Sequence, residues 1–191
     1  MSIDFKRYTE DYLAETNEIV STIDRESIVK IIEILSDIKS GGGRLFILGV
    51  GGSAANASHA VNDFRKLAGI ETYAPTDNVA ELTARTNDEG WNTTFSKWLE
   101  VSRLSSNDAL LIFSVGGGSQ TTSLNIKEAV DLALSRGSKI TAIVSRDGGY
   151  AKQHSNACVL VPVVSDERIT PHAEGWQGVV WHLIVNAIAN N

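Results

Sequence analysis

A histidine and an aspartate stand four residues apart, at His59 and Asp63, in the stretch LGVGGSAANASHAVNDF. On a helix, residues at this spacing share one face and lie one turn from each other. Such a pair suits two ligands of one metal ion, or a general base beside the group that orients it. It equally suits a solvated polar face, so the pair alone leaves both interpretations open.

A further histidine lies in the C-terminal stretch TPHAEGWQGVVWHLIVNAIAN. As a helix this stretch is apolar on nearly all sides, which is typical of a buried helix, and we expect its Trp181 face at a subunit interface. Gly178, His182 and Asn186 form a narrow polar strip along it at four-residue spacing. A buried histidine must be hydrogen-bonded or bind a ligand, so His182 is either a satisfied core residue or a functional one.

Two expected strands end in glycine-rich loops. RLFILGV runs into Gly51-Gly52-Ser53, and ALLIFSV runs into Gly116-Gly117-Gly118-Ser119. In an open parallel sheet, ligands bind at the carboxyl ends of strands, where glycine permits close approach and helix N-termini offer free N–H groups. The loops therefore predict one anion site or two adjacent ones, with each serine placed to cap the following helix. Tight strand-to-helix turns without a ligand are the alternative.

The elements that carry these residues follow from the apolar pattern. The expected strands are RLFILGV, a weaker ETYAP, ALLIFSV, KITAIVS and ACVLVPV. Their alternation with helical stretches indicates right-handed crossovers and a three-layer α/β/α sandwich around a parallel sheet. Two helices precede the sheet, over about residues 5–22 and 24–39, the second with Asp24 as N-cap. We predict a single domain over 1–191, with N-terminal helices in 1–40 and an α/β core in 44–191.

Composition narrows the class of protein. The chain has 191 residues, 42% hydrophobic and 21% charged, enough for one sizeable core. The formal net charge of −6 argues against nucleic-acid binding, which needs a basic surface. No apolar run approaches the ~20 residues that span a bilayer, and MSIDFKRYTE lacks the layout of a signal peptide. We expect a soluble, cytoplasmic protein without nucleic-acid or membrane partners, in which the only cysteine, Cys158, is a buried structural thiol.

A dinucleotide fold is a rival interpretation of the first loop. Gly49-x-Gly51-x-x-Ala54 satisfies the loose G-x-G-x-x-A form, and Glu71 stands near the distance expected for a ribose-binding acid. This interpretation gives no role to the second loop or to the pair at His59 and Asp63. A phosphorylated ligand accounts for more of the sequence.

Four motifs together resemble the sugar isomerase (SIS) domain family: LGVGGSAANASHAVNDF, SVGGGSQ, RDGG and ITPHAEGWQGVVWHL. Within it, the chain is most similar to the sedoheptulose-7-phosphate isomerases, or phosphoheptose isomerases, over residues 5–188. The resemblance implies a five-stranded parallel sheet of the flavodoxin and Rossmann type and a homotetramer with active sites between subunits. It also implies interconversion of sedoheptulose 7-phosphate and D-glycero-D-manno-heptose 7-phosphate through an enediol, with metal assistance.

The resemblance also assigns roles to individual positions. The positions matched to phosphate or substrate binding are Gly51, Gly52, Ser53, Asp88, Ser114, Gly116, Gly117, Ser119 and Glu174. Those matched to metal binding are His59, Asp63, Glu174 and His182, of which Asp63 and His182 are also matched to catalysis. Two histidines and two carboxylates suit Zn²⁺, although nitrogen and oxygen donors also admit other divalent ions.

The chain departs from this family at several positions. Asp63 stands in place of a glutamate, Glu174 in place of a glutamine, and Val115 and Gly116 in place of residues with hydroxyl groups. Since eight residues separate Glu174 from His182, a helix would hold them about 12 Å apart along its axis. Either Glu174 precedes the regular helix, or the two ligands come from different subunits.

Two further alternatives stay open at this point. His172 and Gln177 lie close to the proposed ligands in sequence, and either is a candidate to replace one of them. A non-catalytic SIS domain that binds a phosphosugar as a regulator or adaptor is the alternative function. Because an adaptor needs neither His59 nor a carboxylate at position 63 nor His182, their joint presence favours an enzyme.

Overall fold

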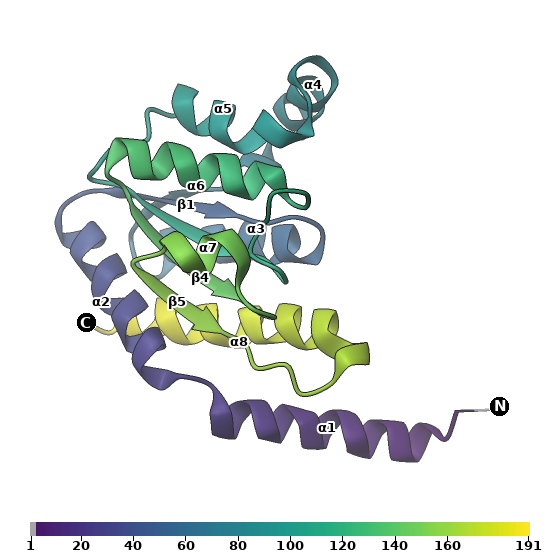
Figure 1. The fold of residues 1–191 in the computed structure, drawn as a ribbon. Helices are drawn as coiled ribbons and strands as arrows, with labels where there is room; N and C mark the ends of the chain where they lie inside the picture. Colours follow the sequence, from purple (N-terminus) through teal and green to yellow (C-terminus); the bar gives the residue numbers. More distant parts are fainter. Residues whose placement is uncertain (1–2) are drawn as a thin grey trace.

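A parallel five-stranded sheet forms the centre of the protein, seen in a computed structural model that describes residues 3–191 (Figure 1). The strands are β1 (Arg44–Leu48), β2 (Glu71–Tyr73), β3 (Ala109–Phe113), β4 (Lys139–Val144) and β5 (Ala157–Leu160). Their order in the sheet is β2-β1-β3-β4-β5, and every neighbouring pair is parallel. The five expected strands and the fold class are therefore confirmed.

Helices cover both faces of the sheet (Figure 1). They are α1 (Phe5–Thr22), α2 (Arg25–Ser40), α3 (Gly52–Lys66), α4 (Val79–Glu89), α5 (Thr94–Val101), α6 (Leu124–Arg136), α7 (Gly149–His154) and α8 (Ile169–Ala189). One core joins α2, α3 and α8 to the sheet, and a second core joins α5, α6 and α7 to its other face. The three expected layers are present, while a single domain over 1–191 stays a prediction.

The strands alternate between the two cores, as the two-residue period of a strand requires. In β1, Leu45 and Ile47 belong to the core under α3 and α8, whereas Phe46 and Leu48 belong to the core under α5 and α6. All four are at most 1% exposed. Because both faces of the sheet are buried, the strands are continuous apolar runs rather than alternating ones.

The two N-terminal helices begin at aspartate caps. Asp24 precedes α2 and accepts a hydrogen bond from the backbone N–H of Glu26 at 3.0 Å, which confirms the expected N-cap. Asp4 caps α1 in the same way. Helix α1 extends away from the sheet (Figure 1), and Phe5 and Leu13 on it are 79% and 58% exposed. Much of its apolar surface is therefore exposed among residues 3–191.

The expectation that the loop serines cap the following helices is wrong. Gly51, with a φ of 64°, occupies the N-cap position of α3, so Ser53 lies inside the first turn. Helix α6 begins only at Leu124, and Ser123 before it makes no side-chain capping bond. Ser119 instead closes its own turn by accepting the N–H of Thr122 at 3.0 Å. Neither α3 nor α6 has a side-chain bond from its N-cap residue. The N–H groups of Ala54 and Ile126 are bonded within their own turns, whereas the first two N–H groups of each helix have no acceptor among residues 3–191.

Helix α8 also differs from expectation in how it uses Trp181. This side chain is fully buried in the chain's own core, between α8 and the sheet, and does not form an exposed interface. The exposed apolar residues of α8 are Val179 and Leu183, at 52% and 47%. The sequence pattern showed an apolar helix on all sides, but packing against α2 and α3 decided which side stayed open.

Two smaller expectations concern the cysteine and the membrane. Cys158 is partly buried, and burial raises the pKa of its thiol to about 11. The thiol is therefore protonated at neutral pH, in agreement with a structural role. Among the helices of residues 3–191, none has the length and apolar character needed to cross a bilayer.

Candidate phosphate cavity and metal cluster

A cavity of about 470 Å³ lies at the carboxyl ends of β1, β3 and β4. Its lining consists of Val50, Ser53, Ser114, Val115, Gly116, Gly118, Ser119, Thr122, Ser123, Arg146 and Thr170. In the strand order, β1 has β2 on one side and β3 on the other, so the chain reverses direction across the sheet at this point. Open α/β sheets bind ligands at such a reversal.

The second glycine loop is held in place by the loop that follows β4. The backbone N–H of Ala151 donates to the carbonyl of Gly117 at 2.9 Å, and that of Tyr150 donates to Gly118 at 2.9 Å. Gly117 has a φ of 71°, and a Cβ there would collide with the carbonyl of Gly148. Only glycine permits this approach of two backbones, so Gly117 holds in place the loop whose other residues line the cavity.

The serine hydroxyls in this cavity have protons to donate. The Ser114 oxygen accepts the N–H of Gly117 at 3.0 Å, and the Ser119 oxygen accepts the N–H of Thr122 at 3.0 Å. Each oxygen acts as an acceptor for the loop and still carries a rotatable O–H, for which the Thr121 hydroxyl at 3.4 Å is one partner of Ser119 within the loop. Together with the uncapped N-termini of α3 and α6, these hydroxyls form a neutral set of donors that suits an anion.

Not every predicted substrate residue lines this cavity. Ser53, Ser114, Gly116 and Ser119 do. The other glycines, Gly51, Gly52 and Gly117, belong to the same loops without lining the cavity. Asp88 lies exposed on α4, where its carboxylate accepts a hydrogen bond from the Asn87 side chain at 2.7 Å. Glu174 lies on α8, with its carboxylate against Gly52, and is also outside the lining.

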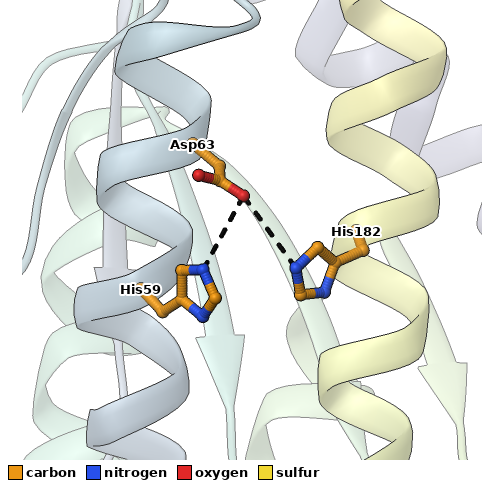
Figure 2. A group of neighbouring side chains, drawn as sticks. All are labelled: His59, Asp63 and His182. Atoms are coloured by element: carbon orange, nitrogen blue, oxygen red, sulfur yellow. Dashed lines mark ion pairs between the residues drawn. The ribbon is translucent and has the colours of Figure 1, made fainter.

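Three predicted metal ligands meet between α3 and α8 (Figure 2). His59 and Asp63 come from α3 and His182 from α8, and their ligand atoms lie within 4.8 Å of one another. One oxygen of Asp63, Oδ2, is 3.9 Å from Nε2 of each histidine. Donors around a tetrahedral Zn²⁺ are roughly 3.3 Å apart, from bond lengths near 2.0 Å, so a small side-chain movement would fit all three to one ion.

The remaining contacts of the cluster orient its donor atoms. Nδ1 of His182 lies 2.7 Å from the carbonyl of Gly178. Since a carbonyl only accepts, Nδ1 carries the proton and Nε2 keeps its lone pair for a ligand. The other Asp63 oxygen, Oδ1, accepts from the Asn62 amide at 2.7 Å. The cluster fits a divalent ion with two nitrogens and one oxygen and leaves further coordination positions open, as catalytic zinc sites do.

The cluster is open toward solvent on one side. The side chain of Asp63 is 15% exposed, whereas those of His59 and His182 are 59% and 46% exposed. The ring of Trp181 lies under the cluster, 4.9 Å from the His59 ring in an edge-on arrangement. The inner side is thus fixed by a buried aromatic ring and the outer side is accessible to another molecule.

Glu174 does not join this cluster within the chain. It lies inside α8, which begins at Ile169, so the idea that it precedes the regular helix is excluded. Helices α3 and α8 run side by side, and Asn56 bridges them by donating to the Glu174 carbonyl at 2.9 Å and to the Gln177 side chain at 3.1 Å. Glu174 therefore lies near the start of α3, and His182 lies two turns further along.

His172 and Gln177, the two alternative metal ligands, do not belong to the cluster of His59, Asp63 and His182. His172 is 4% exposed, stacks on Tyr12 and has Nε2 2.7 Å from a carboxylate oxygen of Glu15. Arg168 also binds that carboxylate, and hydrogen bonds from Arg168 and His172 lower the pKa of Glu15 to about 2. This group attaches α1 to the start of α8. Gln177 is fully buried between α3 and α8, and its amide nitrogen has no partner among residues 3–191.

Sequence reasoning missed several residues of the cavity. They are Val50, Thr122, Ser123, Arg146 and Thr170, while Gly118 was named only as part of the second glycine loop and Val115 only as a departure from the family. Arg146 carried a signal, because the RDGG motif follows a strand as the glycine loops do. Thr170 carried none, since only the packing of α8 brings it to the cavity.

Comparison with known proteins places this geometry in context. A family model described as "SIS domain" matches residues 8–154. A phosphoheptose isomerase from Geobacter sulfurreducens is 31% identical over 160 residues, covering 80% of this chain and 82% of that protein. The lincomycin biosynthesis protein LmbN from Streptomyces lincolnensis is 28% identical over 189 residues, covering 93% of this chain and 67% of that protein.

Solved structures agree with the fold. The phosphoheptose isomerase GmhA from Neisseria gonorrhoeae superposes with a TM-score of 0.82 at 25% identity, covering 97% of each chain. A phosphoheptose isomerase from Francisella tularensis reaches a TM-score of 0.84 at 23% identity over the full length of both chains. The latter likeness concerns the fold alone.

Proposed function

Because the chain belongs to the SIS domain family, we propose that it is an aldose–ketose isomerase that converts sedoheptulose 7-phosphate to D-glycero-D-manno-heptose 7-phosphate. One observation carries this proposal: a donor-lined cavity at the sheet reversal and a cluster of His59, Asp63 and His182 occur in the same chain. The relatives named phosphoheptose isomerase support the class of reaction. Binding a phosphosugar without turnover would need only the cavity.

The cavity holds the phosphate end of the sugar. Hydroxyl protons of Ser114 and Ser119 and the uncapped N–H groups of α3 and α6 donate to the phosphate oxygens. Backbone and hydroxyl donors bind a phosphate without a large positive charge on the protein. This agrees with a chain whose formal net charge is −6.

The reaction moves two protons and needs no external oxidant or reductant. A base removes a proton from C1 of the ketose while the C2 carbonyl oxygen gains one, which gives an enediol. The C1 hydroxyl then loses its proton and C2 gains one, which gives the aldose. Asp63 is the carboxylate base for the carbon-bound proton, and His182 would exchange the proton on oxygen through Nε2 only while that nitrogen is not bound to an ion.

A divalent ion, with Zn²⁺ the best fit to two imidazoles and a carboxylate, is the cofactor of this site. When bound, such an ion polarises the sugar oxygens and stabilises negative charge on them. His59, Asp63 and His182 are its ligands from one chain. Glu174 of the partner subunit is the fourth ligand in this proposal, since Glu174 of the same chain lies two helical turns away from His182.

A homo-oligomer, with a tetramer as the expected state, completes the site. An apolar groove of about 310 Å³ runs between α1, α2 and α8. It is lined by Val20, Ile23, Arg25, Ile28, Val29, Ile32, Trp176, Val179, Val180 and Leu183. Leu183 follows His182 directly, so a second copy of the chain seated in this groove would lie beside the open side of the cluster. The metal cluster and the phosphate cavity share no lining residue within one chain, which supports a site made by more than one subunit.

The test is to incubate zinc-loaded protein with sedoheptulose 7-phosphate in D₂O and follow the sugar by proton NMR. We expect an aldoheptose phosphate that carries deuterium at C2, because the enediol exchanges its proton with solvent. An aldose without deuterium would contradict solvent exchange in the mechanism. An unchanged ketose, and unchanged spectra with a panel of other sugar phosphates, would replace the enzyme proposal by the phosphosugar-binding regulator.

A further inference from the structure

We propose that Arg146 is the cationic ligand of the substrate phosphate and that it replaces the hydroxyl groups absent at Val115 and Gly116. The proposal rests on the proposed function, because it adds a residue to the same phosphate cavity. Arg146 stands in the RDGG motif after β4, where none of the expected site residues lies. It is the only charged residue in the cavity lining described for residues 3–191.

The backbone of Arg146 is held in an uncommon conformation. Its φ is 56°, in the left-handed region that favours glycine. Of the three non-glycine residues with positive φ in residues 3–191, two, Ser123 and Arg146, line this one cavity. Strained residues gather at functional sites, where the surrounding structure holds them in place. A glycine would fit position 146 without strain, so the arginine side chain itself is the feature to explain.

Two backbone contacts fix the direction of this residue. The N–H of Ser145 donates to the carbonyl of Val115 at 3.0 Å, which joins the β4 loop to the second glycine loop. The N–H of Gly148 donates back to the carbonyl of Ser145 at 3.0 Å and closes a tight turn around Arg146. The turn therefore places Arg146 against the loop that carries Ser114 and Ser119.

The side chain of Arg146 passes over Gly116. A Cβ built on Gly116 would have Cδ of Arg146, at 3.9 Å, as its nearest neighbour. The space that a side chain at 116 would take is thus next to the stem of the arginine. Val115 and Gly116 provide no hydroxyl to a phosphate in the cavity. In this proposal the guanidinium group of Arg146 takes their place as donor to that phosphate.

Arg146 has no ion-pair partner in the part of the chain that the structure describes. Arg44, Arg85 and Arg168 each form an ion pair with a carboxylate, whereas Arg146 forms none with any residue from 3 to 191. A guanidinium group offers donors in a planar fork that matches two phosphate oxygens. Such a group therefore offers a phosphate dianion both a positive charge and hydrogen-bond donors.

The experiment measures phosphate binding and turnover separately on the full-length, metal-loaded protein. Arg146→Gln removes the charge and the fork, and Arg146→Lys keeps the charge but not the fork. We expect the Kd for inorganic phosphate, measured by calorimetry, to rise about 10- to 100-fold in Arg146→Gln and less in Arg146→Lys. The KM for the sugar phosphate should rise by a similar factor, with kcat nearly unchanged.

Arg103→Gln is the matched control. Arg103 is also an exposed arginine with positive φ, at 55°, but it lies outside the cavity. Its substitution should change neither the Kd for phosphate nor the KM. An equal loss of phosphate affinity in both variants would mean that the change in net charge causes the effect, and this would overturn the proposal.

A rescue variant tests the replacement itself. Gly116 has no positive φ and has room for a Cβ, so Gly116→Ser is tolerated and returns a hydroxyl to the loop. We expect it to raise the phosphate affinity by a larger factor in the Arg146→Gln background than in the wild type. Equal effects of Gly116→Ser in both backgrounds would show that the hydroxyl and the guanidinium do not serve one phosphate.

The outcomes separate this proposal from the proposed function. A wild-type protein that binds phosphate through Arg146 but isomerises no sugar phosphate would remove the proposed function and keep Arg146 as a phosphate ligand. An active protein whose Arg146→Gln variant binds phosphate as tightly as the wild type would keep the proposed function and remove Arg146 as a phosphate ligand. A wild-type protein that binds no phosphate would overturn both.

Discussion

The phosphate cavity and the metal cluster are built by different means. The cavity is made largely of main chain: two glycine loops and two uncapped helix N-termini meet at the carboxyl ends of β1, β3 and β4. The cluster is made of three side chains from α3 and α8, and its outer side is open. The cavity is complete in one chain, whereas the cluster has room for a further ligand.

This difference teaches where each part of the function is sensitive to change. Main-chain donors are fixed by the fold, so the cavity fails when the backbone is displaced. Side-chain donors are fixed by rotamers and neighbours, so the cluster fails when one functional group is replaced without any change in backbone. Substitutions chosen on this basis should separate phosphate binding from turnover.

The largest effect on turnover is expected from Asp63→Asn. The amide keeps the shape of the side chain but cannot accept the carbon-bound proton, so kcat should fall about 10²- to 10⁴-fold. The Kd for inorganic phosphate, measured by calorimetry, should stay within about twofold, since Asp63 does not line the cavity. Metal content should be measured in parallel, because Asp63 is also a proposed ligand.

Asp37→Asn is the control for this variant. Asp37 is an exposed carboxylate near the end of α2, at the opposite end of the sheet. Its substitution should leave both kcat and phosphate binding unchanged. Substantial turnover by Asp63→Asn would remove Asp63 from the mechanism.

The opposite pattern, a loss of phosphate affinity with unchanged zinc affinity, is expected from Gly117→Ala. A Cβ at this position collides with the Gly148 carbonyl, so the two loops must separate and phosphate affinity should fall about 10- to 100-fold. Zinc affinity, measured by competition with a chromophoric chelator, should not change. Gly42→Ala is the matched control, since Gly42 has a similar φ of 66° but nothing within 4 Å of the added Cβ. An equal loss in both variants would assign the effect to φ strain rather than to the collision.

A smaller effect, about a tenfold loss of turnover at micromolar protein, is expected from Leu183→Glu. This side chain is 47% exposed in the apolar groove next to His182, so a charge there should disfavour a second subunit. Sedimentation velocity should show a lower molecular mass, and activity should recover at higher protein concentration. Val101→Glu, which introduces a charge at a residue that is 71% exposed on α5, is the control. A monomer with full activity would disprove the site between subunits.

The smallest effect on activity is expected from Glu15→Gln, which alters the attachment of α1 to the start of α8. Loss of the ion pair with Arg168 should reduce the free energy of unfolding by about 2 kcal/mol at pH 7. The folded pKa of Glu15, about 2, is below its ordinary value of 4.5, so the carboxylate stabilises the protein above pH 4.5. This contribution is lost as the pH falls from 4.5 toward 2.

Urea denaturation at several pH values checks this prediction. The difference in unfolding free energy between wild type and Glu15→Gln should be constant above about pH 5 and should shrink below pH 4.5. Turnover and phosphate affinity should change little, since Glu15 lies in neither the cavity nor the cluster. A difference that grows toward low pH would contradict the assigned ion pair.

The sequence by itself determined the elements and much of the site. Apolar runs predicted all five strands, Asp24 predicted the start of α2, and helical spacing placed His59 beside Asp63. Glycine loops after β1 and β3 indicated where the cavity lies, because strand ends and glycines are local signals. These features depend on residues close together in the chain.

The tertiary structure alone decided how distant residues combine. It brought His182 to the pair on α3, placed Arg146 and Thr170 in the cavity and buried Trp181 in the chain's own core. It also corrected the expected helix caps, because Ser53 lies inside the first turn of α3 and Ser119 holds its own turn. The physical reason is the same in each case: these contacts depend on how α8 and the β4 loop pack, and packing is set by shape and burial across the whole chain rather than by local spacing.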